Sequence, residues 1–173
     1  MNNAVLDALK KRRSIRSYEE RMIEDEKLAL ILEAATYAPS AMGRQSATMV
    51  VVKDKEALKE LSRLNAKVMN SDSDPFYGAP LAVIVFGDTN FNNYVQDASL
   101  VMQNLMVASY SLGIGSCWIN RAKEMFEYPE AQKYLKKWGL EDHYEGVAVC
   151  ILGYQKGETR KAKPRKDNYV IYD

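Results

Sequence analysis

The hydrophobic pattern of the chain is clearest between Asp97 and Ile119. Apolar residues recur there at steps of three or four, which predicts a helix over 97–112 with one buried stripe. The residues of that stripe and those that widen it are Val101, Leu105, Ala108, Leu112, Met102, Met106 and Val107. Because little polar surface is left, we expect this helix to be covered on most sides, either within one core or between two subunits.

Shorter runs on both sides of this helix predict alternating helices and strands. Helices are expected over 3–12, 24–37, 54–65, 122–126 and 130–138, and strands over 48–52, 81–87, 116–119 and 145–154. Two of these strands are apolar throughout, as in strands covered on both faces. The alternation indicates one domain over residues 1–173, of α/β or α+β class, with a single sheet of four or five strands flanked by helices.

Composition and charge argue against a protein that binds nucleic acid or a membrane. The 24 Lys and Arg residues nearly balance the 23 Asp and Glu residues, so the net charge of +1 favours neither nucleic acid nor an anionic membrane. The longest apolar runs, 81–86 and 147–152, are too short to span a bilayer, and no signal peptide is seen. We therefore expect a cytoplasmic protein without nucleic-acid or membrane partners.

The cysteines and the histidine exclude some chemistry. Cys117 and Cys150 each lie in an apolar, strand-like run, which indicates buried free thiols in a reducing compartment rather than a disulfide. With His143 as the single histidine, we expect no zinc site and little scope for Ser-His or Cys-His nucleophilic catalysis.

Basic residues gather near both ends of the chain. Arg12, Arg13, Ser14 and Arg16 follow the first predicted helix and could hold a phosphate, although a solvated charge run at a helix end gives the same pattern. Residues 156–166 carry six Lys or Arg, a pattern that a solvated tail or a nucleic-acid patch would give. The closing YVIY (169–172) could add an edge strand to its own sheet or to that of a partner.

Two further segments are irregular. The loop 38–47 is made of small and polar residues that allow close approach to a ligand. The polar stretch 66–80 is expected to shape a substrate pocket.

Taken in order, several motifs resemble the nitroreductase family of flavin enzymes over nearly the whole chain. The motifs are RRSIR (12–16), APSAMGRQ (38–45), the run 97–119, LGY (152–154) and KPRK (163–166). The resemblance implies a nitroreductase-like fold of α+β, three-layer type with a mostly antiparallel sheet. It also implies a homodimer with FMN at the interface and a C-terminal strand exchanged with the partner subunit.

The resemblance assigns roles to the basic ends of the chain. Arg12 matches the residue directed to the FMN phosphate, and Arg16 the residue at the pyrimidine edge of the flavin, with Arg13 and Ser14 in the same segment. Lys163 and Arg165, also cofactor-binding by resemblance, match a basic pair that closes on the same phosphate. Arg16 and Asn120 are the predicted catalytic residues.

The resemblance also assigns the remaining FMN contacts. The loop that reaches the flavin from the other subunit corresponds to Pro39, Ser40, Ala41 and Gly43. An amide near the ring corresponds to Asn70. The strand end over the ring corresponds to Trp118, Ile119 and Asn120, with the backbone N–H of Asn120 assigned to flavin N5. The chain departs from the family at Gly43, where Asn is usual, and at Ser46 and Ala47, where Pro-Trp is usual.

The activity implied is an FMN-dependent exchange in two steps, with NAD(P)H as the donor and a nitroaromatic, a quinone or a similar small molecule as the acceptor. A flavin-binding redox sensor or FMN store without turnover remains an alternative, as do ene reduction, dehalogenation and flavin cleavage on the same fold. A nucleic-acid binder built on the two basic ends is a further alternative.

Overall fold

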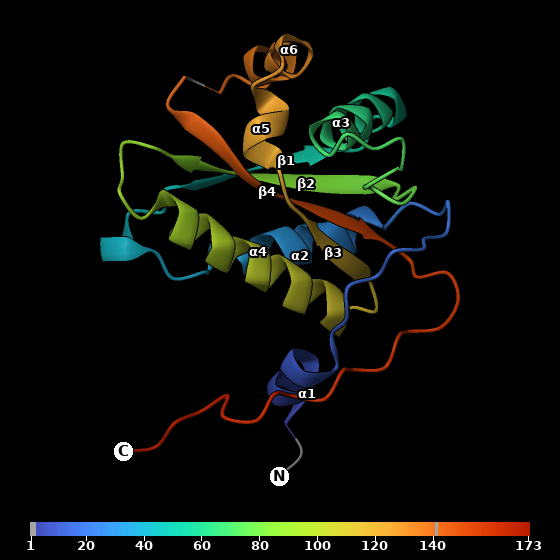
Figure 1. Cartoon of the computed structure of the whole chain (residues 1–173), viewed down its shortest axis with the longest axis vertical. Coiled ribbons are helices and arrows are strands. Elements are labelled where there is room, and N and C mark those ends of the chain that lie inside the picture. Colours follow the sequence, from blue (N-terminus) through green and yellow to red (C-terminus); the bar gives the residue numbers. More distant parts are fainter. Residues whose placement is uncertain (1–2, 141) are drawn as a thin grey trace.

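The computed structural model describes residues 3–140 and 142–173 and arranges them in three layers (Figure 1). The elements of the first half are α1 (Ala4–Lys11), α2 (Asp25–Thr36), the 3₁₀ turn η1 (Ala41–Gly43), β1 (Ala47–Val52), α3 (Lys55–Val68) and β2 (Leu81–Asp88). Those of the second half are α4 (Tyr94–Ser111), β3 (Gly115–Ile119), α5 (Ala122–Phe126), α6 (Pro129–Lys137) and β4 (Tyr144–Gly153).

The sheet has four antiparallel strands in the order β1-β2-β4-β3, which confirms the predicted α+β class. Figure 1 shows α3, α5 and α6 on one face of the sheet and α2 and α4 on the other. Strands β2 and β4 lie in the middle and are buried along almost their whole length, as their uninterrupted apolar runs predicted. Strand β3 lies at one edge.

Each face of the sheet carries its own hydrophobic core. On the side of α3, α5 and α6, Leu61 and Phe86 are fully buried, and the Phe86 ring lies 5.0 Å from that of Phe126. On the side of α2 and α4, Ile31 and Met102 are fully buried. Since Cys117 belongs to the first core and Cys150 to the second, the two thiols lie on opposite faces of the sheet and are both free and buried.

Two helices extend three residues beyond their predicted bounds. Helix α4 begins at Tyr94 rather than at Asp97, because the Tyr94 hydroxyl donates a hydrogen bond of 2.6 Å to Glu145 of β4 and anchors an extra turn. Helix α3 continues past Asn65 to Val68, because the core-facing side of the helix continues through Ala66.

Helix α4 is covered by its own chain toward the sheet and toward α2, where Asn104 Nδ2 donates a bond of 3.1 Å to the carbonyl of Ala34. Met102 and Leu105 face the sheet and are buried, whereas Leu100 and Tyr110 are exposed. The prediction that α4 is covered on most sides is therefore met in a single chain only toward the sheet and α2, and the remaining side is exposed.

The two ends of the chain lie away from the sheet. Figure 1 shows α1 below α4, with the C-terminal tail running past it. The apolar stripe of α1 is exposed, with Val5 64% accessible, and Tyr172 in the tail is 90% accessible. Residues 169–172 form no strand, so the prediction that they extend their own sheet is wrong; their addition to a partner's sheet stays a prediction.

No helix within the described residues is both long and apolar enough to cross a membrane.

Candidate functional site

The basic segment after α1 runs along the outer edge of β3. The backbone N–H of Ile15 donates to the carbonyl of Ser116 at 2.9 Å, and Ser14 forms a parallel bridge with Ser116. A Cβ atom on Gly115 would lie 3.0 Å from Cγ1 of Ile15, so glycine lets the two segments approach this closely. The sheet edge therefore holds the segment 12–16 in place.

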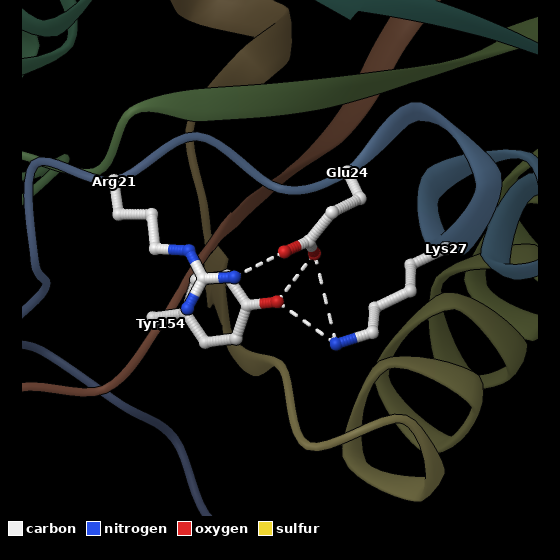
Figure 2. Close-up of polar contacts among 4 residues, drawn as sticks. All are labelled: Arg21, Glu24, Lys27 and Tyr154. Carbon is white, nitrogen blue, oxygen red and sulfur yellow. Dashed lines mark hydrogen bonds and ion pairs between the residues drawn. The ribbon is translucent and has the colours of Figure 1, made fainter.

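A polar cluster beyond the end of β4 fixes the chain that follows this segment (Figure 2). The Tyr154 hydroxyl donates to Glu24 and accepts a bond of 2.9 Å from Lys27, while Arg21 pairs with Glu24 and stacks 4.3 Å from the Tyr154 ring. The Tyr154 hydroxyl, supported by Arg21, lowers the pKa of Glu24 to about 2. The cluster ties the chain before α2 to the end of the sheet.

Arg12 and Ser116 face a small cavity of about 160 Å³ at the C-terminal end of α4. Arg12 Nη1 and Ser116 Oγ are buried and have no hydrogen-bond partner among the described residues. Such groups are costly to leave unpaired, most of all on a charged side chain. Arg13 differs, because its Nη1 donates to the carbonyls of Lys10 at 2.8 Å and of Arg12 at 2.6 Å. The cavity thus has donors that lack an acceptor, which suits an anion.

Arg16 brings a second positive charge to the same edge. Burial raises the pKa of the Cys117 thiol, while the charges of Arg16 and Arg12 and the Ser14 hydroxyl act to lower it. Because these effects act over short distances, the three side chains lie near Cys117 of β3. The Arg16 guanidinium is itself exposed and lies 5.9 Å from the centre of the Tyr77 ring. Arg16 can therefore meet a ligand lying along β3.

The far end of β3 turns backbone groups toward the outside of the sheet. In an antiparallel edge strand, successive residues turn their backbone N–H and C=O alternately toward the neighbouring strand and away from it. Since the Ser116 carbonyl faces outward to Ile15, the backbone of Trp118 also faces outward, and Asn120 follows directly after the strand. The indole N–H of Trp118 is buried without a partner among the described residues.

Asn65 is a residue of this site that the sequence analysis missed. Its side chain is fully buried on α3, and its Nδ2 donates a bond of 2.8 Å to the carbonyl of Asn120. The sequence did contain a signal for it, because Asn65 stands four residues after Leu61 and so lies on the apolar face of the predicted helix. Such a position demands a hydrogen-bond partner inside the protein.

The small-residue loop lies at the opposite end of α4. The buried carboxylate of Asp97 accepts bonds from the backbone N–H of Ala41 at 2.9 Å and from the Ser46 hydroxyl at 2.7 Å. Tyr110 of α4 lines the Arg12 cavity, thirteen residues further along, which is about 20 Å at 1.5 Å per residue. Within one chain, Pro39, Ser40, Ala41 and Gly43 therefore lie far from the basic segment.

A larger cavity of about 870 Å³ lies between α3 and the segment 69–80. Asn70, which follows the end of α3, lines this cavity, and its predicted contact with the flavin ring stays a prediction. The cavity wall on α3 has basic residues at every fourth position, namely Lys55, Lys59, Arg63 and Lys67. Acidic residues on the other walls are Glu20, Asp72 and Asp74. The cavity is large enough for a co-substrate.

The C-terminal basic pair lies in the exposed tail. Gln155 and Thr159, at the start of that tail, line the Arg12 cavity. Arg165 donates a bond of 2.8 Å to the carbonyl of Lys163, and the described residues provide no contact of either side chain with Arg12. The beginning of the tail thus reaches the cavity, while the closing of Lys163 and Arg165 on a phosphate stays a prediction.

Comparison with known proteins agrees with this architecture. The nitroreductase family profile matches residues 9–154. A protein of Archaeoglobus fulgidus, named for NADH dehydrogenase and NAD(P)H nitroreductase, is 35% identical over 153 residues, which are 85% of this chain and 83% of the relative.

Two solved structures also superpose closely. A nitroreductase of Bacteroides fragilis with bound FMN has a TM-score of 0.90 and 31% identity, covering 99% of both chains. A nitroreductase of Desulfitobacterium hafniense, also with bound FMN, has a TM-score of 0.88 and 28% identity over the full length of both chains. The chain belongs to the nitroreductase family.

Proposed function

We propose that this protein binds FMN along β3 and transfers electrons from NAD(P)H to a small acceptor such as a quinone or a nitroaromatic compound. Membership of the nitroreductase family makes the chain an NAD(P)H-dependent flavin oxidoreductase. The observation that carries the proposal is the buried, unpaired pair of donors at Arg12 Nη1 and Ser116 Oγ beside a cavity.

The residues present fit FMN. A phosphate would supply the acceptor that Nη1 of the half-buried Arg12 lacks, and guanidinium groups bind phosphate strongly. The outward backbone of Trp118 and the backbone N–H of Asn120 offer polar groups that a planar heteroaromatic ring can use, while the Asn120 carbonyl is already bonded to Asn65. When bound, FMN supplies the redox chemistry, taking a hydride from NAD(P)H and passing two electrons to the acceptor.

The protein groups then position the reactants and adjust the charge around them. Arg16 places a positive charge beside β3, where it would stabilise negative charge that develops on a ligand. Asn120 presents its backbone N–H at the strand end. The cavity beside α3 would admit the co-substrate, and its row of lysines and Arg63 would favour the phosphates of NAD(P)H.

A complete site on this proposal needs two copies of the chain. The loop at Ala41 and the cavity at Arg12 lie at opposite ends of α4, so a second copy would have to bring its loop to the first copy's β3. The exposed stripe of α1, the outer side of α4 and the apolar tail would supply the contact surface between copies. We therefore propose a homodimer.

Titration of the FMN-free protein with FMN tests the binding step. Quenching of flavin fluorescence should saturate at one FMN per chain, and the FMN-bound protein should sediment as a dimer. Lumiflavin, which lacks the ribityl phosphate, should bind much more weakly because it leaves Arg12 without an acceptor. Equal affinity for FMN and lumiflavin would overturn the phosphate assignment, and no affinity for FMN would overturn the proposal itself.

A further inference from the structure

The turn between β3 and α5 is held by one buried amide on a distant helix. Asn65 Nδ2 donates to the carbonyl of Asn120 at 2.8 Å, and Asn65 Oδ1 accepts from Nε of Arg121 at 3.4 Å. Asn65 has no exposed surface and lies on α3, while its two partners follow β3. A single side chain thus bridges two consecutive residues of the turn.

These partners fix which way the amide faces. A carbonyl oxygen can only accept a hydrogen bond and a guanidinium nitrogen can only donate one. The amide nitrogen must therefore face Asn120 and the amide oxygen must face Arg121. An aspartate at this position could serve Arg121 but would set an oxygen against the Asn120 carbonyl, and a leucine could serve neither.

The backbone of the turn needs such support. Arg121 has φ of 70°, in the left-handed region that non-glycine residues seldom occupy, and its carbonyl accepts the first bond of α5, from Met125 at 2.9 Å. A residue keeps such a conformation where its surroundings determine it strongly, and these residues concentrate at functional sites. On the other side of Asn120, the pairing of Ile119 with Val149 holds the strand.

We propose that Asn65 is a positioning residue for flavin reduction, which fixes the Asn120–Arg121 turn so that the backbone N–H of Asn120 points outward from β3 toward flavin N5. This inference rests on the proposed function. N5 of oxidised flavin can accept that hydrogen bond, whereas N5 of reduced flavin carries a hydrogen, so a well-aligned N–H favours the oxidised form. Asn65 acts through Asn120 and touches no reacting atom.

Three variants test this role. Asn65→Leu keeps the side-chain size and removes both bonds, and Asn65→Asp keeps the acceptor for Arg121 and loses the donor to Asn120. Ser62→Ala is the matched control, since Ser62 is also a buried polar residue of α3 but bonds to Asp74 instead. Far-UV circular dichroism and thermal unfolding of each FMN-free protein establish that it is folded.

The decisive measurement is the two-electron midpoint potential of the bound flavin, together with its rate of reduction by NADH. In both Asn65 variants we expect the preference for oxidised over reduced flavin to fall about tenfold, which raises the potential by about 30 mV for a two-electron couple. We expect the reduction rate to fall about 10- to 100-fold through misplacement of the reacting groups. Ser62→Ala should keep the wild-type potential, because Ser62 bonds to neither Asn120 nor Arg121; it is a control for the potential and for folding, since its partner Asp74 lines the proposed co-substrate cavity.

The inference is overturned if a folded Asn65 variant keeps both the wild-type potential and the wild-type rate. It is also overturned if neither Asn65 variant folds while Ser62→Ala does, because Asn65 would then determine the fold rather than position a donor. A wild-type protein that binds no FMN would contradict the proposed function instead, so the two failures are distinguishable.

Discussion

The carboxylate of Asp97 lies 2.7 Å from the hydroxyl of Ser46, and this bond fixes the loop 38–47 to the N-terminal half of α4. The second carboxylate oxygen accepts from the backbone N–H of Ala41 at 2.9 Å. The loop departs from the family pattern at Gly43 and Ser46, and both departures have a local reason. Gly43 has φ of 66°, which glycine adopts without strain, and Ser46 supplies the donor that Asp97 binds.

Replacing Asp97 by alanine should loosen this loop. Two donors, the Ala41 N–H and the Ser46 hydroxyl, would lose a buried charged acceptor, so the free energy of unfolding should fall by about 2–3 kcal/mol and the melting temperature by roughly 5–10 °C. If the loop completes the FMN site of a second copy, FMN affinity should fall as well. Thermal unfolding and flavin fluorescence titration measure these effects.

Ser99→Ala is the matched control for that change. Ser99 also lies on α4 near its N-terminus, but its hydroxyl bonds only to the carbonyl of Val95 in the same helix. It should change the melting temperature by less than about 2 °C. Equal effects of the two substitutions would show that the loop is held by other contacts.

Arg12 and Arg13 should differ in their effect on FMN affinity although they are neighbours. Arg12→Leu removes a half-buried guanidinium whose Nη1 is buried without a partner among the described residues, so the FMN-free protein should be no less stable, while FMN affinity should fall about 10- to 100-fold with the lost charge-assisted bond. Arg13→Leu should weaken FMN binding less than about threefold, because Arg13 Nη1 already bonds to two backbone carbonyls. Fluorescence titration at fixed ionic strength compares the two, and the reverse order would refute the assignment of Arg12.

Deletion of residues 167–173 should weaken the dimer. These residues are exposed and make no strand in one chain, yet they include four consecutive apolar or aromatic residues, Tyr169 to Tyr172. Sedimentation velocity over a range of concentrations should show dimer for the full chain and an increased monomer fraction for the shortened chain. An unchanged dimer would mean that the tail does not embrace a partner.

The Tyr154 cluster should make stability depend on pH in the acid range. The pKa of Glu24, held to about 2 in the folded chain by Tyr154 and Arg21, returns to an ordinary value of 4.5 on unfolding. Its contribution is therefore fully present above pH 4.5 and is lost as the pH falls toward 2. The melting temperature of wild type should exceed that of Tyr154→Phe at pH 6, and the difference should narrow between pH 4.5 and pH 2.5. A difference that stays constant with pH would show that Tyr154 acts through packing alone.

Much of the fold followed from local periodicity. The stripe along α4 and the uninterrupted apolar runs of β2 and β4 predicted their elements to within a few residues, because burial against the sheet imposes both patterns. Where the bounds were wrong, as at Tyr94, a bond to Glu145, 51 residues away, extends the helix. A short stretch of sequence around Tyr94 does not include Glu145 and therefore cannot predict this contact.

The candidate site was predicted less completely, for the same reason. Arg12 and Arg16 stand in a short motif and could be identified from it, whereas Asn65 acquires its role only through contact with Asn120, 55 residues later. Asp97 appeared as the first residue of a helix, and its bonds to Ala41 and Ser46 became visible only in the fold. Contacts between elements, and contacts between copies of the chain, are what the linear pattern lacks.

The most direct test of the central claim is the absorption spectrum of the FMN-bound protein, recorded without oxygen before and after addition of NADH or NADPH. The account predicts that the flavin bands bleach with at least one of the two donors. They should return on addition of a quinone or a nitroaromatic compound, with one acceptor reduced by two electrons per flavin. Flavin bands that persist with both NADH and NADPH would contradict the account and would favour a flavin-binding sensor or store.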